Sequence, residues 1–350
     1  MGSEWQMIWK FAFAKERNVS ARTPAIWRDQ IIGAFVYDRK GFFESTIIAL
    51  SMDDGRELWR RTIDHVANEP VIETDGTIYI ASFAGAIHAY APDGSPVWTS
   101  AFGKSNINVP VLSGDRLFVA EIGGSGSKTW CLAKSNGDVV WSYENGGHSY
   151  RLVAHDDKLF HATAGSGPRF GESAIHLHCL KQSSGEKVWS IEVNQYHFTA
   201  IVAGGLLLWA ARGALNAYDP TDGELKAHLP IPERTAITSG PIAAGDKIIV
   251  ADDSGIIRAA ALERKGLLFK KPILCERWSS SLPDTFVGEP VIFGDHVYVL
   301  GEKGKVHRFG MDGRAIGPVL SVEVGKGGGL SSADGKIAIS SGRTISVYRP

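Results

Sequence analysis

The chain has 350 residues, which is enough for one large domain or two of ordinary size. Its 44% of apolar and 21% of charged residues are those of an ordinary globular protein. A formal net charge of −1 excludes a general attraction to nucleic acid or to an anionic membrane, and no apolar run is long enough to cross a bilayer as a helix.

The N-terminal segment MGSEWQMIWKFAFAKER has no basic leader followed by a continuous apolar stretch. We therefore expect no secretory signal and a cytoplasmic location, with a periplasmic location left open for a chain whose signal peptide has been removed. The cysteines, Cys131, Cys179 and Cys275, are scattered and odd in number, which argues against a disulfide framework. No two of them have the C-x-x-C spacing of a zinc or redox site.

A repeated pattern runs through the chain from residue 47 to residue 320. Each copy has an apolar strand and a polar turn that ends in glycine, and in the first four copies a tryptophan opens the next strand: Trp59, Trp98, Trp141 and Trp189. The turn glycines recur every 38 to 48 residues, at Gly55, Gly94, Gly137, Gly185, Gly223, Gly266 and Gly313. This period is typical of a four-stranded propeller blade. The aspartates before several of these glycines, Asp54, Asp93, Asp222 and Asp312, are predicted to form the turns.

A second turn, rich in glycine and aspartate, occurs eight times, from residues 28–30 to residues 333–335. The turn glycines indicate seven repeats and the second turn indicates eight. The two counts differ by one because both ends of the chain are predicted to contribute strands to the last blade. The C-terminus supplies GGLSSA, KIAISS and TISVYRP, and the N-terminal segment WQMIWKF supplies the fourth strand, with Trp9 in the repeat tryptophan position. We predict that residues 1–350 form one all-β domain, an eight-bladed β-propeller of four-stranded antiparallel blades, with seven blades as the alternative.

The pattern ALSMDDGRELW at residues 49–59, with its echoes SGEKVW and NGDVVW, resembles the PQQ-like propeller repeat. One branch of that family, the quinoprotein dehydrogenases, holds PQQ and calcium over the channel and has a disulfide between adjacent cysteines. The other branch, the BamB-like propellers, binds no cofactor and scaffolds other proteins. This chain has no adjacent cysteine pair and is too short for the enzymes' insertions, so the resemblance implies the cofactor-free branch. It also lacks a lipoprotein signal with its modified cysteine, a departure from BamB itself.

The long insertions are all predicted on one propeller face, at Phe35 to Ser45, Glu121 to Lys128, Ala164 to Ser173 and Cys275 to Phe286. Aromatic and arginine side chains, which dominate interface hot spots, are expected there to form a partner-binding face: Tyr37, Arg39, Phe42, Phe43, Arg169, Phe170, Arg277 and Trp278. In the alternative interpretation these aromatics fold back onto the blades.

The entries to the inner strands are predicted to form a channel rim that includes Glu69, Tyr150, Thr199 and Glu289. Paired carboxylates at such a rim bind a cation or a small polar ligand, although solvated rim residues are the more ordinary interpretation. His176 and His178 point to one side of a strand, with His161 as the nearest further ligand. We favour ordinary polar face residues over a metal site here.

No catalytic motif is present, and we expect no catalytic residues, cofactor or metal. The sequence favours a non-catalytic protein-binding scaffold that is monomeric on its own. Two alternatives stay open: a small-ligand sensor or quinoprotein-type oxidoreductase that uses the channel, and a carbohydrate-binding propeller.

Overall fold

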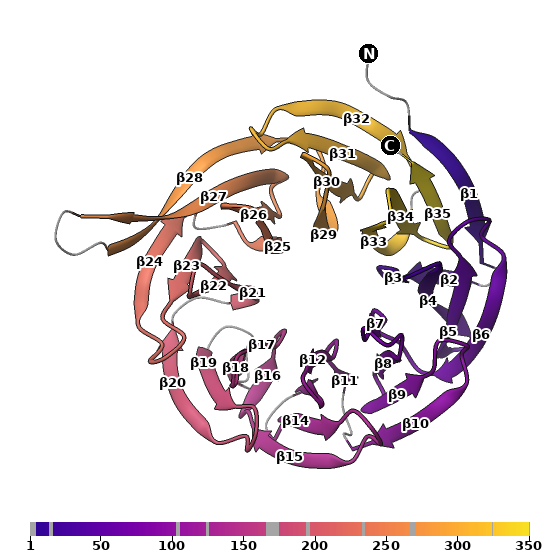
Figure 1. The fold of residues 1–350 in the computed structure, drawn as a ribbon, viewed down its shortest axis with the longest axis horizontal. Helices are drawn as coiled ribbons and strands as arrows, with labels where there is room; N and C mark the ends of the chain where they lie inside the picture. Colours follow the sequence, from indigo (N-terminus) through magenta and orange to yellow (C-terminus); the bar gives the residue numbers. More distant parts are fainter. Residues whose placement is uncertain are drawn as a thin grey trace. The chain divides into compact units, whose positions relative to one another are not determined.

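The computed structural model describes residues 5–13, 17–102, 106–123, 126–165, 175–193, 197–232, 235–266, 271–323 and 325–349. The chain divides into two compact units, one made of Met1–Val109 with Phe286–Pro350 and the other of Pro110–Thr285. Throughout the described ranges the regular secondary structure is β-strand (Figure 1). No helix in this part of the chain is long and apolar enough to cross a membrane.

The described part of the first unit contains three sheets, and the first of them has nine strands drawn from both ends of the chain. In the first, β2 (Arg17–Ala21) and β3 (Ala25–Trp27) both pair with β4 (Gln30–Arg39), which is followed by β5 (Phe42–Ser51) and β6 (Glu57–Asp64). The second consists of β7 (Val71–Ile72), β8 (Ile78–Ser82), β9 (Ala86–Tyr90) and β10 (Pro96–Ala101). The third consists of β29 (Phe286–Phe293), β30 (His296–Gly301), β31 (Lys305–Gly310) and β32 (Ala315–Ser321). The short strand β11 (Asn106–Ile107) also belongs to this unit.

The nine-stranded sheet continues, through the parallel pairing of Ser20 with Lys326, into strands from both ends of the chain. Strands β33 (Lys326–Ala333), β34 (Lys336–Ser341) and β35 (Thr344–Arg349) are completed by β1 (Gln6–Ala12), which pairs antiparallel with β35 (Figure 1). Trp9 is the partner of Val347 in this register. The predicted closure of the last sheet by the N-terminal strand is therefore confirmed, and it leaves β35 without a free edge.

The described part of the second unit contains four antiparallel sheets. The first contains β12 (Val111–Ser113), β13 (Arg116–Ile122), β14 (Lys128–Ala133) and β15 (Val139–Glu144), and the second contains β16 (Gly147–Ser149), β17 (Val153–His155), β18 (Lys158–Gly165), β19 (Ile175–Lys181) and β20 (Lys187–Val193). The third consists of β21 (His197–Ala203), β22 (Leu206–Ala211), β23 (Ala214–Tyr218) and β24 (Leu225–Pro230). The fourth consists of β25 (Ile237–Ala244), β26 (Lys247–Asp252), β27 (Ile256–Lys265) and β28 (Lys271–Ser281). The all-β prediction is confirmed, and three sheets in the first unit, of which one holds the strands of two blades, with four sheets in the second are consistent with eight blades.

Neighbouring sheets within a unit are locked by the repeat tryptophans. The indole N–H of Trp59 donates to the carbonyl of Pro92 (2.8 Å), and its ring lies against Gly94 in the turn of the next sheet. In the second unit Trp189 donates to the carbonyl of Pro220 in the same way (3.2 Å). Trp9 and Trp141 repeat the contact with the carbonyls of Met52 and Gln182. Each tryptophan thus buries a large ring and satisfies its one polar group at once.

The repeat aspartates form the turns as predicted. In each of four turns a side-chain Oδ1 accepts the backbone N–H two residues further on, from Asp54, Asp93, Asp222 and Asp312. At Asp93 the hydroxyl of Ser95 donates as well, and this hydrogen bond lowers the pKa of the carboxyl group. These side chains therefore replace backbone partners in tight turns.

Strands that are covered on both faces by neighbouring sheets are apolar on both faces. All six residues of β22, from Leu206 to Ala211, are buried. Cys131 and Cys179 are buried opposite Trp141 and Trp189, as Ala49 is buried opposite Trp59, so they fill small core positions. Burial raises the pKa of both thiols to about 12, which keeps them protonated and unreactive at neutral pH.

Candidate functional site

The segment from Phe35 to Ser45 is a continuation of β4 and β5, and the prediction of a loop insertion there is wrong. The pairing runs without interruption from Gln30 opposite Ser51 to Arg39 opposite Phe42. Lys40 and Gly41 form the turn with positive φ values of 55° and 90°. Such a two-residue turn matches the twist of the flanking strands, so this hairpin extends with full backbone pairing.

The four residues predicted on this hairpin have different environments. Tyr37 is buried, with its hydroxyl 3.2 Å from Oγ1 of Thr46 and its ring against Phe13, so it stabilises the hairpin. Arg39 is exposed, and its Nη1 donates to both carboxylate oxygens of Glu44 at 3.0 and 3.1 Å. Phe42 and Phe43 remain 78% and 56% exposed. Their rings form an apolar tip that costs free energy in water, because the hairpin leaves them uncovered.

Arg277 and Trp278 belong to β28, so the prediction of a crossing loop from Cys275 onward is also wrong. Trp278 lies opposite Ala259, and a bulge follows between Ala259 and Ala260. Trp59 lies opposite Ala49 with a bulge in the equivalent place. Trp278 therefore holds the repeat tryptophan position of its sheet, a role that the sequence analysis missed because the turn between the strands is displaced.

The displaced turn makes β27 and β28 a long hairpin that projects past β24 (Figure 1). Residues 259–261 are alanines, and small residues also lie opposite the other repeat tryptophans. This run of alanines is the sequence signal that could have located the bulge. Beyond the bulge the strands carry charges. Arg277 forms an ion pair with Glu263 (2.5 Å), and Lys265 approaches the same carboxylate at 3.8 Å. Arg277 is therefore engaged within the hairpin.

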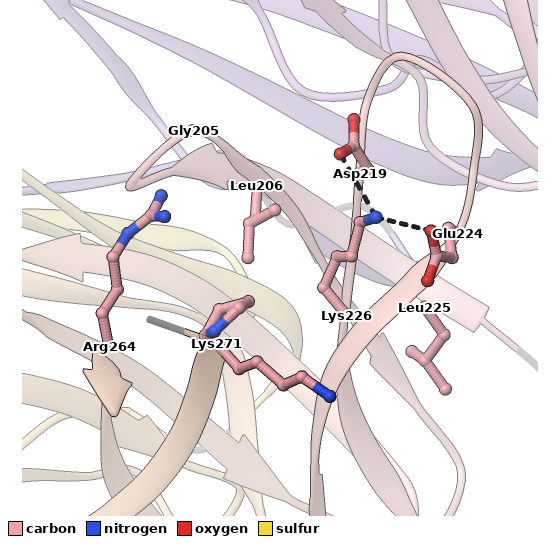
Figure 2. Close-up of a pocket in the computed structure, with 9 residues that line it drawn as sticks. Gly205, Leu206, Asp219, Glu224, Leu225, Lys226, Arg264 and Lys271 are labelled. Carbon is pink, nitrogen blue, oxygen red and sulfur yellow. Dashed lines mark hydrogen bonds and ion pairs between the residues drawn. The ribbon is translucent and has the colours of Figure 1, made fainter. Parts of the chain in front are cut away.

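A pocket of about 620 Å³ lies between this hairpin and β24 (Figure 2). Lys226 crosses one wall between Asp219 (3.7 Å) and Glu224 (2.6 Å), so the charges on that side are largely compensated. The hairpin contributes Arg264 and Lys271, both exposed. Within the described residues neither of these two cations forms an ion pair, so the hairpin side of the pocket is positive.

The predicted rim residues are distributed over both units. Glu69 precedes β7 and Glu289 lies in β29 of the first unit. In the second unit the backbone N–H of Tyr150 donates to the carbonyl of Ala162, and the hydroxyl of Thr199 donates to the carbonyl of Gly240. Their grouping around a channel stays a prediction. Arg169 and Phe170 lie outside the described residues.

The three histidines form a cluster on β18 and β19, in which His161 and His178 are buried and His176 is half-buried. The rings of His161 and His178 are 4.8 Å apart, and those of His176 and His178 are 5.9 Å apart. Ser149 and Thr163 hydrogen bond to His161 Nδ1 and His178 Nε2. Burial lowers the pKa of His161 and of His178, that of His178 to about 4, so these two rings are neutral at pH 7. In the described part of the chain no group of three or more His, Cys, Asp or Glu side chains is arranged to hold a metal ion.

Comparisons with known proteins find a match to one family over part of the chain and several similar solved structures. Residues 44–193 match the family described as outer membrane protein assembly factor BamB. No curated protein matches the sequence. The crystal structure of BamB from Moraxella catarrhalis is similar with a TM-score of 0.69 and 16% identity, over 99% of this chain and 100% of that one.

Two further solved structures share the architecture. Sqt1 from Chaetomium thermophilum is similar with a TM-score of 0.75 and 13% identity, over 99% of each chain. Quinohemoprotein alcohol dehydrogenase from Comamonas testosteroni gives a TM-score of 0.65 and 12% identity, over 99% of this chain and 76% of that one. Likeness at these identities shows the fold and not the activity. The predicted resemblance is confirmed: the chain has a β-propeller fold, and its residues 44–193 are similar to the family described as outer membrane protein assembly factor BamB.

Proposed function

We propose that this chain is a non-catalytic protein-binding propeller and that the tip of the β4–β5 hairpin is a contact surface for its partner. The observation that carries this proposal is the exposure of the adjacent residues Phe42 and Phe43, at 78% and 56%. Aromatic side chains bury a large area at low entropic cost when a partner covers them. The fully paired hairpin holds the rings in place before binding, which lowers the ordering cost of association.

The ion pair between Arg39 and Glu44 supports the same role. It stands beside the exposed rings, with one carboxylate bound through both of its oxygens. An apolar centre with a polar border is the usual composition of a protein interface. The family match to an outer membrane protein assembly factor and the likeness to BamB agree with a protein partner.

The experiment is affinity capture from the native source, read by mass spectrometry, with the variant Phe42→Ala/Phe43→Ala. We expect the specific partners of the wild-type chain to be lost while the melting temperature is maintained. The matched control is Val139→Ala/Val140→Ala, which trims two exposed adjacent apolar residues (46% and 41%) on β15. Capture that survives the phenylalanine changes, or that is lost equally in the control, contradicts the assignment of this surface.

We also propose that residues 1–350 form one domain that is monomeric alone and cytoplasmic, as expected from the sequence. Light scattering and cell fractionation test these points, and a periplasmic fraction would contradict the proposed location. Thermal shift with PQQ and calcium tests the quinoprotein alternative, for which a clear shift with dye-linked alcohol oxidation would contradict a purely binding role. A glycan array tests the carbohydrate alternative.

A further inference from the structure

The hairpin of β27 and β28 is longer than the packing of its sheet requires. In the sheets of Trp59 and Trp189 the strand pairing ends one residue pair beyond the tryptophan. In the hairpin of Trp278 the pairing continues to Lys265 opposite Lys271. Insertions in single copies of a repeat often lie on the binding face of a repeat protein, so this extension is a candidate contact element.

The sheet that precedes this hairpin lacks the repeat tryptophan. Ala227 stands, next to a strand bulge, in the position that Trp59 holds in its own sheet. Elsewhere the ring closes the space to the following turn by packing against its glycine, as Trp59 does at Gly94. Beside β24 the following turn is displaced to the end of the hairpin, so this closing contact is missing and a pocket remains.

Leucine side chains hold the base of the hairpin against β24. Leu274 is 7% exposed and belongs to the hydrophobic core cluster of the two sheets. Leu262 packs against the same cluster, as do Ala227 and Leu229 of β24. A hairpin supported in this way presents its outer side chains in a fixed position, which lowers the ordering cost of binding.

The pocket of about 620 Å³ follows these leucines along the hairpin and has both charged and apolar walls (Figure 2). Arg264 and Lys271 line it from the hairpin. Leu225, which is 48% exposed, and Pro272 add apolar surface. Because both cations and Leu225 are exposed, a bound molecule reaches them directly, and a volume of this size accepts several of its side chains.

The uncompensated charge of the pocket lies on the hairpin. The two carboxylates of the lining, Asp219 and Glu224, both form ion pairs with Lys226, at 3.7 and 2.6 Å. Among the residues that the structure describes, Arg264 and Lys271 form no ion pair. A ligand whose carboxylates face the hairpin therefore gains two attractive contacts, and a cationic ligand is repelled there.

The mixed lining favours a peptide over a small anion. Exposed cations hold a small anion weakly, because water and salt screen the attraction. Covering the apolar surface of Leu225 and Pro272 adds a hydrophobic contribution that salt does not screen. A segment that carries both carboxylates and an apolar side chain uses both parts of the lining.

We propose that this pocket binds an extended acidic segment of a protein partner, with carboxylates on Arg264 and Lys271 and an apolar side chain over Leu225 and Pro272. This surface belongs to the second unit, whereas the β4–β5 tip belongs to the first. The proposal does not depend on the tip being a contact surface.

Selection of random linear peptides displayed on phage, with the full chain as bait in about 50 mM sodium chloride, tests the proposal. We expect the selected peptides to combine aspartate or glutamate with a large apolar residue. A fluorescein-labelled selected peptide is expected to bind with a Kd below about 100 μM by fluorescence anisotropy. Selected peptides without an excess of acidic residues, or the absence of any selected peptide, overturn the proposal.

Arg264→Glu and Lys265→Glu form a matched pair, because they change the net charge equally at neighbouring positions. Successive side chains of a strand point to opposite faces, and Arg264 lines the pocket. We expect Arg264→Glu to weaken peptide binding at least about tenfold and Lys265→Glu to weaken it less than about threefold. Equal weakening, or binding unaffected by Arg264→Glu, overturns the proposed site. Unchanged melting temperatures show that both variants fold.

Leu225→Ser tests the apolar contact, and Val188→Ser, which alters a 41% exposed side chain on β20, is its control. We expect weaker peptide binding only in Leu225→Ser. Equal binding by both variants, or displacement of the peptide by inorganic phosphate below about 1 mM, would assign the cations to a small anion and overturn the proposal.

The variant Phe42→Ala/Phe43→Ala separates this surface from the β4–β5 tip. It is expected to bind the selected peptide as tightly as the wild-type chain does, even if its partner capture is lost. Loss of peptide binding in this variant would place the peptide at the tip and overturn the assignment to the pocket.

Discussion

Trp9 lies opposite Val347 in the register of β1 and β35, although the two residues belong to opposite ends of the chain. The indole of Trp9 is packed against Gly55, and its N–H donates to the carbonyl of Met52 (3.0 Å). A single side chain therefore joins β1, in the part of the nine-stranded sheet made by the two termini, to the turn between β5 and β6 of the same sheet.

Trp9→Ala is expected to lower the free energy of unfolding by about 3–5 kcal/mol, because it removes a buried ring and its hydrogen bond. Urea denaturation followed by circular dichroism measures the change. The control is Met7→Ala on the same strand, where the side chain is 53% exposed and a change below about 0.5 kcal/mol is expected. Equal losses in the two variants would mean that Trp9 does not lock the closure.

Gly94→Ala is expected to destabilise the protein more than Gly41→Ala. Both glycines have positive φ, 80° and 90°, so each alanine carries a backbone cost of about 1–2 kcal/mol. A methyl group at Gly94 would also overlap Cδ2 of Trp59, whereas one at Gly41 meets nothing within 4 Å. This overpacking adds about 1–3 kcal/mol. Thermal unfolding of the pair measures the difference, and equal melting temperatures would refute the tryptophan packing argument.

Asp252→Asn is expected to lower the free energy of unfolding by about 3–5 kcal/mol, because it leaves the buried guanidinium of Arg258 without its main countercharge. The two side chains are 1% and 9% exposed and 3.1 Å apart. Asn retains the oxygen that accepts the turn N–H groups of Ser254 and Ile256. Chemical denaturation measures the loss. The control Glu276→Gln alters the second, more exposed partner of Arg258 and is expected to cost less.

Stability is expected to fall as the pH decreases from about 6.5 to about 4. The folded-state pKa of His178 is about 4 against 6.5 for a free side chain, so the unfolded chain takes up the proton first. The contribution of His178 to the free energy of unfolding is complete above about pH 6.5 and declines below it. It amounts to on the order of 3 kcal/mol. His161 acts in the same direction.

Melting temperatures across this pH range, in buffers without carboxylate or phosphate, measure the effect. His178→Gln removes one titrating ring and is expected to flatten the profile. An unchanged slope in this variant would show that His178 does not contribute.

The local repeat made most of the fold predictable. Glycine and aspartate at fixed offsets specify turns, and tryptophan after each turn specifies the packing between sheets, because these preferences depend on residues that are close in sequence. The same logic placed Trp9 in the sheet of the C-terminal strands. Phe42 and Phe43 were named as candidate contact residues from an expected loop insertion; both are exposed, and their role as contacts stays a prediction.

The sequence did not reveal how far each hairpin extends. Residues 35–45 and 275–281 resemble loop insertions when read one strand at a time, and only the cross-strand register assigns them to β4, β5 and β28. The uncompensated charges of Arg264 and Lys271 are likewise invisible in the sequence, because they depend on which partners adjoining strands supply. The sequence by itself determined the repeating sheet and its closure, since both follow from local turn and packing chemistry. The tertiary structure decided the candidate sites, since exposure and charge compensation arise only when distant segments meet.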